Sequence, residues 1–132
     1  MLDRSSTPLN ALLRRRRPGH SLEAPFYTSP EIFAADIEAI FERTWIFVGV
    51  EPDVPEPGDA LTVDIGANAI LLVRDDDMAV RAFHNVCRHR GARLVHDEKT
   101  TVGNLVCRYH SWTYNLDGDL IHAEHMGGDF NP

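Results

Sequence analysis

Two short cysteine–histidine pairs constrain this sequence more than any other feature. Cys87 is followed by His89 and Cys107 by His110, and the chain contains no other cysteine. A disulfide between the two cysteines is one interpretation, although a reducing compartment such as the cytoplasm disfavours it. Because each cysteine has a histidine just after it, metal binding by two thiolates and two imidazoles is the stronger interpretation.

The order of the ligand types distinguishes two kinds of metal site. Zinc fingers also use two Cys and two His, but they usually place one residue type in each arm. Here each arm mixes the types, as Cys-x-His and Cys-x₂-His. Mixed arms allow both loops to give a thiolate to one iron of a [2Fe–2S] cluster and an imidazole to the other. We therefore expect such a cluster on Cys87, His89, Cys107 and His110, with zinc as the alternative.

The first third of the chain is expected to hold an arm and one helix. Residues 1–27 are polar, rich in Arg and Pro and without periodicity, which predicts an arm. A helix is expected over residues 29–44, because Thr28 and Glu31 have the spacing of a capping box. Apolar residues then recur at helical spacing, namely Phe33, Ile37, Ile40, Phe41 and Trp45.

The remaining sequence predicts a mainly β fold. The run Asp75-Asp76-Asp77 is interpreted as a solvated hairpin turn, and Asp117-Gly118 predicts a second tight hairpin. Many short strands with regular turns are typical of a small antiparallel β-sandwich or partly open barrel. The expected strands are 46–50, 60–64, 69–74, 78–84 and 103–106, followed by the hairpin at 114–120.

Composition excludes several classes of partner. The 132 residues are 43% hydrophobic and 25% charged, as in an ordinary globular domain. A net charge of −7 argues against nucleic acid, and no apolar run approaches the ~18–20 residues that cross a bilayer. The basic run at residues 14–17 is not followed by the apolar segment of a secretory signal. We expect a solvated arm and a cytoplasmic location.

The two arms and their flanking residues resemble the Rieske part of ring-hydroxylating oxygenase α-subunits. The similarity lies in residues 85–91 and 109–114, with seventeen residues between His89 and Cys107. Respiratory Rieske proteins carry an additional cysteine pair, which this chain does not have. Residues 17–27 resemble the branch that demethylates or oxidises quaternary ammonium compounds such as glycine betaine, carnitine or choline.

This resemblance implies a Rieske-type β fold over residues 28–132, with one [2Fe–2S] cluster on the four ligands. It also implies that Trp112 is a bulky cover over the cluster. Arg88, Arg90 and Arg108 would bring positive charge beside the thiolates and contact acidic groups of a neighbouring subunit or domain, with plain solvation as the alternative for each. The implied activity is one-electron transfer within an oxidoreductase, a monooxygenase or dioxygenase, and no residue of this chain is expected to be catalytic.

The family's α-subunits continue into a C-terminal domain whose mononuclear Fe(II) is held by two histidines and a carboxylate. We interpret His122 and His125 as surface residues, so that domain and its oxygenase turnover are expected to be absent from this sequence, as in a fragment or a truncated product. The resemblance implies an NAD(P)H-dependent reductase or a ferredoxin as electron donor. The acceptor would be the missing domain or a neighbouring subunit of a homotrimer.

Two alternative functions remain at this stage. A free-standing Rieske ferredoxin would transfer electrons in the same way, but it would have little use for the first 45 residues. A zinc-stabilised interaction module would use the same four ligands without any redox chemistry.

Overall fold

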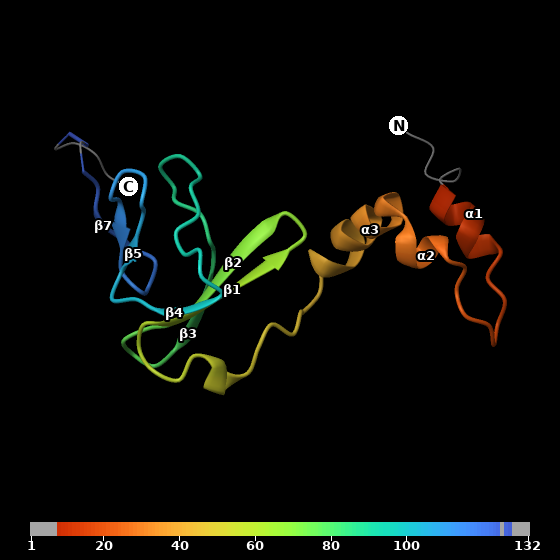
Figure 1. The fold of residues 1–132 in the computed structure, drawn as a ribbon, viewed down its shortest axis with the longest axis horizontal. Helices are drawn as coiled ribbons and strands as arrows, with labels where there is room; N and C mark the ends of the chain where they lie inside the picture. The colour runs from red at the N-terminus through yellow and green to blue at the C-terminus, as the bar shows by residue number, and fades with distance from the viewer. Residues whose placement is uncertain (1–7, 125, 128–132) are drawn as a thin grey trace. The chain divides into compact units, whose positions relative to one another are not determined.

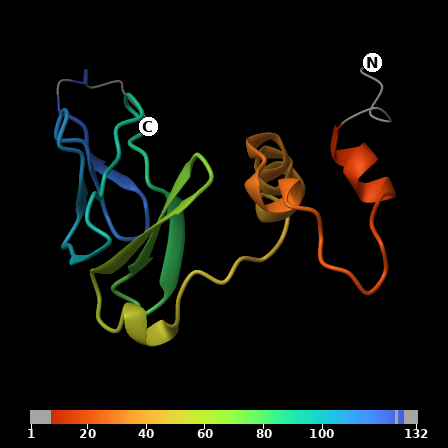
Figure 2. The same ribbon diagram turned by 45° about the vertical axis from the view of Figure 1, so that its right-hand side comes forward.

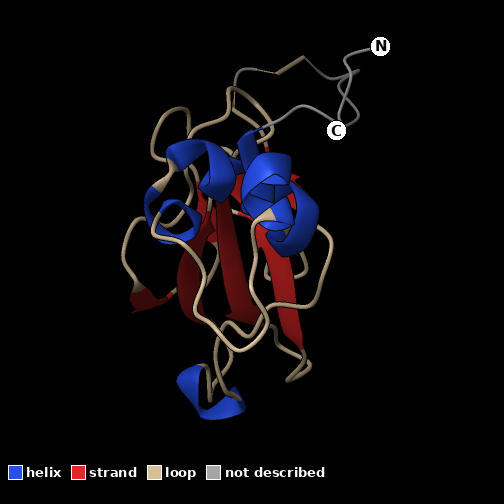
Figure 3. Cartoon of the chain, turned by 90° about the vertical axis from the view of Figure 1, so that its right-hand side faces the viewer, coloured by secondary structure: helices blue, strands red, loops and turns tan. Residues whose placement is uncertain are grey.

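The structure, a computed structural model, describes residues 8–124, 126 and 127. It divides the chain into two compact parts, the helical unit up to Ile46 and the β unit from Phe47 onward (Figure 1). Figure 3 marks the helices of the chain in blue and its strands in red. Among the described residues, no helix is long and apolar enough to cross a membrane.

The helical unit contains three short helices and one π-helical turn. The first helix was not expected, because residues 1–27 show no apolar periodicity. It buries a single side chain, Leu12, and one apolar contact is too little to produce a periodic pattern. The elements are α1 (Pro8–Arg14), α2 (Pro25–Thr28), α3 (Pro30–Asp36) and η2 (Ile37–Phe41).

Helix α3 begins at a different cap from the one expected. Thr28 ends α2, where its hydroxyl donates to the Ala24 carbonyl at 3.1 Å, so Thr28 cannot cap the next helix. Ser29 takes that place, and its Oγ atom accepts a hydrogen bond from the Ile32 N–H at 3.3 Å. The helical stretch ends at Phe41, three residues before the expected end at residue 44.

Two antiparallel sheets form the β unit (Figure 2), which confirms the expected mainly β, Rieske-like fold. The strand order is β3-β2-β1-β4 in the first sheet and β5-β6-β7 in the second. The strands are β1 (Asp59–Ile65), β2 (Asn68–Arg74), β3 (Val80–His84), β4 (Lys99–Thr101), β5 (Leu105–Val106), β6 (Thr113–Tyr114) and β7 (Leu120–His122).

The expected strand at residues 46–50 was wrong, and one real strand was missed. Residues 46–50 pair with no strand, and the Val50 N–H donates to the Asp53 carboxylate at 2.9 Å in the turn η3 (Glu51–Asp53). Strand β4 has the sequence Lys-Thr-Thr and pairs with β1. It is too short and too polar to show an alternating apolar pattern.

One hydrophobic core joins the two sheets. Leu71 and Val73 of β2 are fully buried, and they point to the same face because side chains alternate along a strand. Tyr114 reaches the same core from β6. Cys87 and Cys107 also belong to it, so both cysteine–histidine pairs begin inside the core.

A charge network built on the buried Asp75 carboxylate connects the sheets, and it corrects the interpretation of residues 75–77 as merely a solvated turn. The Asp75 side chain is 1% exposed. It accepts hydrogen bonds from the Ala79 N–H at 2.7 Å and from the Arg81 side chain at 2.6 Å. Arg81 also donates to Asp117 at 3.1 Å, in the hairpin between β6 and β7. Arg81 therefore ties a turn of the first sheet to a turn of the second.

We predict that Asp75→Asn destabilises the β unit. Burial alone would raise the pKa of the Asp75 carboxyl, but the hydrogen bonds from Arg81 and the Ala79 N–H hold that pKa below its usual value. A folded-state pKa below the unfolded one stabilises the fold above the unfolded pKa, and this contribution disappears as the pH falls through the folded pKa. Urea unfolding should show lower stability for the variant at pH 7, and the difference should shrink below about pH 4.

The matched control is Asp76→Asn, which removes one exposed negative charge from the same turn. It should leave the free energy of unfolding nearly unchanged. Equal effects of the two substitutions would show that the Asp75 network contributes nothing beyond surface charge.

Candidate metal centre

The first ligand loop, residues 85–92, closes on its own cysteine. The Cys87 N–H donates to the Ala92 carbonyl at 2.7 Å, and the Gly91 N–H donates to the Cys87 carbonyl at 2.9 Å. Gly91 has a φ of +73°, a left-handed conformation that glycine adopts without steric cost. The chain therefore turns tightly at Gly91, and the residues between Cys87 and Gly91 form the tip of the loop.

The second ligand loop, residues 107–112, repeats this hydrogen-bonding frame. The Cys107 N–H donates to the Trp112 carbonyl at 2.8 Å, and the Ser111 N–H donates to the Cys107 carbonyl at 2.9 Å. Ser111 occupies the place that Gly91 has in the first loop, and its φ is +56°. A non-glycine residue in this conformation costs about 1–3 kcal/mol, so the surrounding contacts hold the second loop against local strain.

The two loops differ in where they carry histidine. His89 lies two residues after its cysteine, and His110 lies three residues after its own. The loops nevertheless bring the two imidazoles together, with ring centroids 4.8 Å apart and planes inclined at 65°. Figure 1 shows these loops, in teal and blue, at the same end of the β unit. All four predicted ligands therefore gather at one place.

Asn85 holds the base of the first loop, and sequence reasoning did not identify it. Its side chain is buried and donates to the Val95 carbonyl at 2.7 Å. Its oxygen accepts from the Leu94 N–H at 3.1 Å and from the Val95 N–H at 3.0 Å. These bonds fix the chain on both sides of the loop. The partners lie nine and ten residues away and are all backbone atoms, so no sequence pattern marks them.

Both cysteines are reduced and are each 2% exposed. Burial raises the pKa of the Cys87 thiol, but the Tyr114 hydroxyl and the backbone N–H groups of His89 and Arg90 outweigh it, so the pKa lies below its usual value. The Cys107 thiol lies within interaction distance and acts in the same direction. Cys87 is thus buried in a setting that favours its thiolate, the form that binds metal.

Tyr114 is the second residue that sequence reasoning missed. Its hydroxyl oxygen lies 3.4 Å from Cys87 Sγ and accepts a hydrogen bond from the Arg88 N–H at 3.0 Å. Burial, together with the neighbouring Cys87, raises the pKa of Tyr114 to about 12, which keeps the hydroxyl protonated and able to donate to sulfur. The contact joins residues 27 positions apart, in a loop of one sheet and a strand of the other.

Aromatic rings surround the two imidazoles. Trp112 is 5% exposed, and its ring stacks on His89 with a centroid distance of 4.7 Å and an interplanar angle of 7°. The centroids of the Tyr109 and His110 rings are 3.9 Å apart, and the Arg90 Cζ atom lies 6.0 Å from the Tyr109 ring centroid. The imidazoles are half-buried, whereas the thiols are fully inside. Trp112 therefore orients His89 from within the core.

The three arginines of the ligand loops and the two histidines near the end of the chain were also singled out from the sequence. Arg88, Arg90 and Arg108 are all exposed on the ligand loops. His122 is exposed on β7, where it pairs with Thr113 just after the second ligand loop, and His125 lies outside the described residues.

The donor set fits a two-iron cluster. Two thiolates and two imidazoles are the ligands of a Rieske [2Fe–2S] centre, which takes two protein ligands at each iron. The backbone N–H groups aimed at Cys87 could also donate to cluster sulfur. Within the described part of the chain, no three His, Cys, Asp or Glu side chains come together around a single ion.

Comparison with known families supports this interpretation of the donor set. The Rieske [2Fe-2S] domain family matches residues 44–128, which is more than half of the chain. The chain belongs to this family. A Rieske domain implies a [2Fe–2S] cluster, as the ligand spacing predicted.

Individual relatives show which members of the family the chain is similar to. It is 51% identical over 121 residues to a glycine betaine monooxygenase oxygenase subunit of Chromohalobacter salexigens, covering 91% of this chain and 27% of that protein. It is 39% identical over 98 residues to a carnitine monooxygenase oxygenase subunit of Acinetobacter baumannii, covering 74% and 26%. The apo quaternary ammonium Rieske monooxygenase CntA superposes with a TM-score of 0.73 at 35% identity, covering 81% and 32%.

The chain is therefore homologous to the Rieske part of quaternary-ammonium oxygenase α-subunits, and the family resemblance stated from sequence is confirmed. These α-subunits are oxidoreductases. The chain spans just over a quarter of the length of the glycine betaine relatives that it matches.

We predict that Tyr114→Phe lowers the reduction potential of the cluster-loaded chain. The reduced cluster is more negative, so a hydrogen bond to its cysteine ligand stabilises it more than the oxidised form. One hydrogen bond contributes about 1 kcal/mol, which corresponds to a shift of about −40 mV for one electron. Spectroelectrochemical titration measures the shift.

The control is Tyr109→Phe, which removes an exposed hydroxyl but keeps the ring beside His110. Its potential should match that of the unmodified chain. If Tyr114→Phe leaves the potential unchanged as well, the Tyr114 hydroxyl does not act on the cluster.

Proposed function

We propose that this chain binds one [2Fe–2S] cluster and passes single electrons as the Rieske part of a quaternary-ammonium oxygenase α-subunit. Cys87 and Cys107 would hold one iron, and His89 and His110 the other. The observation that carries the proposal is the convergence of two buried thiols and two imidazoles from loops that share one frame. When bound, the cluster accepts and releases one electron, at a potential of roughly −150 to +300 mV.

The burial of the ligands supports an electron path through the histidines. The thiols lie inside the core, while the imidazoles are half-buried at the loop tips. Nδ1 of His110 is shielded from solvent, so this nitrogen faces inward and suits ligation. The Nε2 nitrogen of the same ring would then face the surface, where it could meet a carboxylate of an electron acceptor.

The proposed partners follow from the relatives. Their names describe oxygenase subunits of glycine betaine and carnitine monooxygenases. We propose an NAD(P)H-dependent reductase or a ferredoxin as the electron donor. The acceptor would be a catalytic domain with a mononuclear iron, in the same polypeptide or in a neighbouring subunit of a homotrimer. Arg88, Arg90 and Arg108, exposed around the histidines, would pair with acidic groups of such partners.

A free-standing Rieske ferredoxin is the alternative function. The helical unit argues against it, because the match to the glycine betaine monooxygenase subunit extends over 91% of the chain. Such a match includes most of the helical unit, which carries none of the four ligands.

We predict that anaerobically reconstituted protein contains about two irons and two acid-labile sulfides per chain. Cys107→Ala should abolish this content, because it removes a thiolate that no other residue can replace. His122→Ala removes an exposed histidine outside the ligand loops and should leave the content unchanged. One zinc without sulfide would reject the cluster and favour a zinc-stabilised interaction module.

We predict that the loaded 132-residue chain takes up one electron in a reductive titration but consumes no O₂ with glycine betaine. Cys87, Cys107, His89 and His110 would hold the cluster for one-electron transfer, and no ligand set for a separate oxygen-activating iron is found among the described residues. An oxygen electrode with chemically reduced protein checks this. O₂ consumption that depends on glycine betaine would contradict the assignment of this chain to electron transfer alone.

A further inference from the structure

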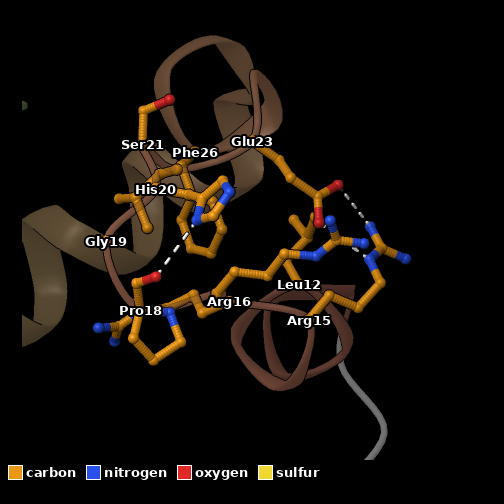
Figure 4. A pocket seen from close by; sticks show the side chains of 11 residues that line it. Leu12, Arg15, Arg16, Pro18, Gly19, His20, Ser21, Glu23 and Phe26 are labelled. Atoms are coloured by element: carbon orange, nitrogen blue, oxygen red, sulfur yellow. Dashed lines mark hydrogen bonds and ion pairs between the residues drawn. The ribbon is translucent and has the colours of Figure 1, made fainter.

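A basic pocket lies within the helical unit, and none of the four predicted cluster ligands lines it. It has a volume of about 600 Å³, within the range of small-molecule sites. Figure 4 shows its two walls, with Leu12 on α1 and Arg15 just after that helix on one side, and Glu23 and Phe26 on the segment facing them. We call this cavity the arm pocket, and its main lining residues are Leu12, Arg15, Arg16, Arg17, His20 and Phe26.

The arm pocket is held open by contacts within its own walls. Arg15 donates two hydrogen bonds to the Glu23 carboxylate, at 3.1 and 3.0 Å, which fastens the two walls together. Gly19, with a φ of +75°, lets the chain reverse between them. The His20 ring is fixed by a hydrogen bond between its Nδ1 and the Pro18 carbonyl at 3.2 Å. The cavity is thus formed before any ligand enters.

The charges in the pocket are not balanced. Glu23 neutralises Arg15, but within residues 8–124 neither Arg16 nor Arg17 has an ion-pair partner. Residues 1–24 hold five Arg and two acidic residues, whereas residues 25–132 hold eight Lys or Arg and eighteen acidic residues. The pocket therefore concentrates positive charge in a chain whose net charge is −7.

Both polar and apolar groups line the cavity. Leu12 is 7% exposed and Phe26 is half-buried, so they provide an apolar surface beside the guanidinium groups. Guanidinium donors match the planar oxygens of carboxylates and the oxygens of phosphates. We propose that the arm pocket binds a small organic anion, a carboxylate or a phosphate, through Arg16 and Arg17, with the carbon skeleton against Leu12 and Phe26.

Titration of the full cluster-loaded chain with inorganic pyrophosphate and, separately, with citrate tests this proposal. Amide ¹H–¹⁵N shifts of Gly19 and Ser21 should move and saturate with at least one probe, and the probe that binds tells phosphate from carboxylate. Arg16→Gln/Arg17→Gln should weaken binding at least about tenfold, since each charge-assisted hydrogen bond contributes about 1.5–3 kcal/mol.

The matched control is Arg43→Gln/Lys99→Gln, which removes two positive charges from residues that do not line the pocket. Binding to this control should stay within about twofold, a bound set by the weak, salt-screened effect of exposed charges that do not contact the ligand. Equal loss in both variants, or no saturable shift with either probe, overturns the proposal. The absorption spectrum of the cluster, recorded on the same samples, tests the proposed function separately, because the arm pocket contains none of its ligands.

Sedimentation of the unmodified chain and of Arg16→Gln/Arg17→Gln excludes a different occupant. If the pocket binds acidic residues of a second copy, the unmodified chain associates without any probe and the variant does not. That result overturns the small-anion site, whereas the same association state for both supports it.

Discussion

Both cysteine sulfurs lie inside the hydrophobic core, and the arrangement of the site depends on this burial. A buried thiolate is costly unless donors surround it, and here the donors are the Tyr114 hydroxyl and backbone N–H groups of the first loop. Each loop closes on its own cysteine, so the chain between must turn outward. The imidazoles then have to occupy the rim, with the thiols beneath them. The burial of the two cysteine sulfurs therefore accounts both for the depth of the thiols and for the position of the imidazoles nearer the surface.

The two halves of the site come from different sheets. The first loop follows β3, and the second connects β5 to β6. Their relative position depends on the core that both sheets share, and on the Arg81 bridge between Asp75 and Asp117. The contact of Tyr114 with Cys87 crosses the same boundary. The shared core, the Arg81 bridge and the Tyr114–Cys87 contact thus hold the two imidazoles at their 4.8 Å separation.

The sequence allowed prediction of features that depend on local pattern. The four ligands were recognisable because their spacing is short, and β1 and β2 because their apolar residues are contiguous. The roles of Asn85 and Tyr114 in the site were not predicted, because their partners are backbone atoms or residues far along the chain. Residues 46–50 have high β-propensity but find no partner strand, so tertiary pairing overrides propensity. Asp75 looked solvated because its burial and its hydrogen bonds from Arg81 and the Ala79 N–H arise only after folding.

Two groups of cationic residues in this acidic chain have different surroundings. Arg88, Arg90 and Arg108 are exposed beside the half-buried histidines, and Arg90 lies over the Tyr109 ring. Such a surface suits a protein partner, since an electron acceptor has to approach the imidazoles closely. Arg16 and Arg17 line a cavity with an apolar wall, and a cavity of that size admits a small anion more readily than a folded surface. Salt should therefore weaken both the docking of a protein partner at the ligand loops and the binding of an anion in the arm pocket. Only anion binding in the arm pocket should depend on the shape of the anion.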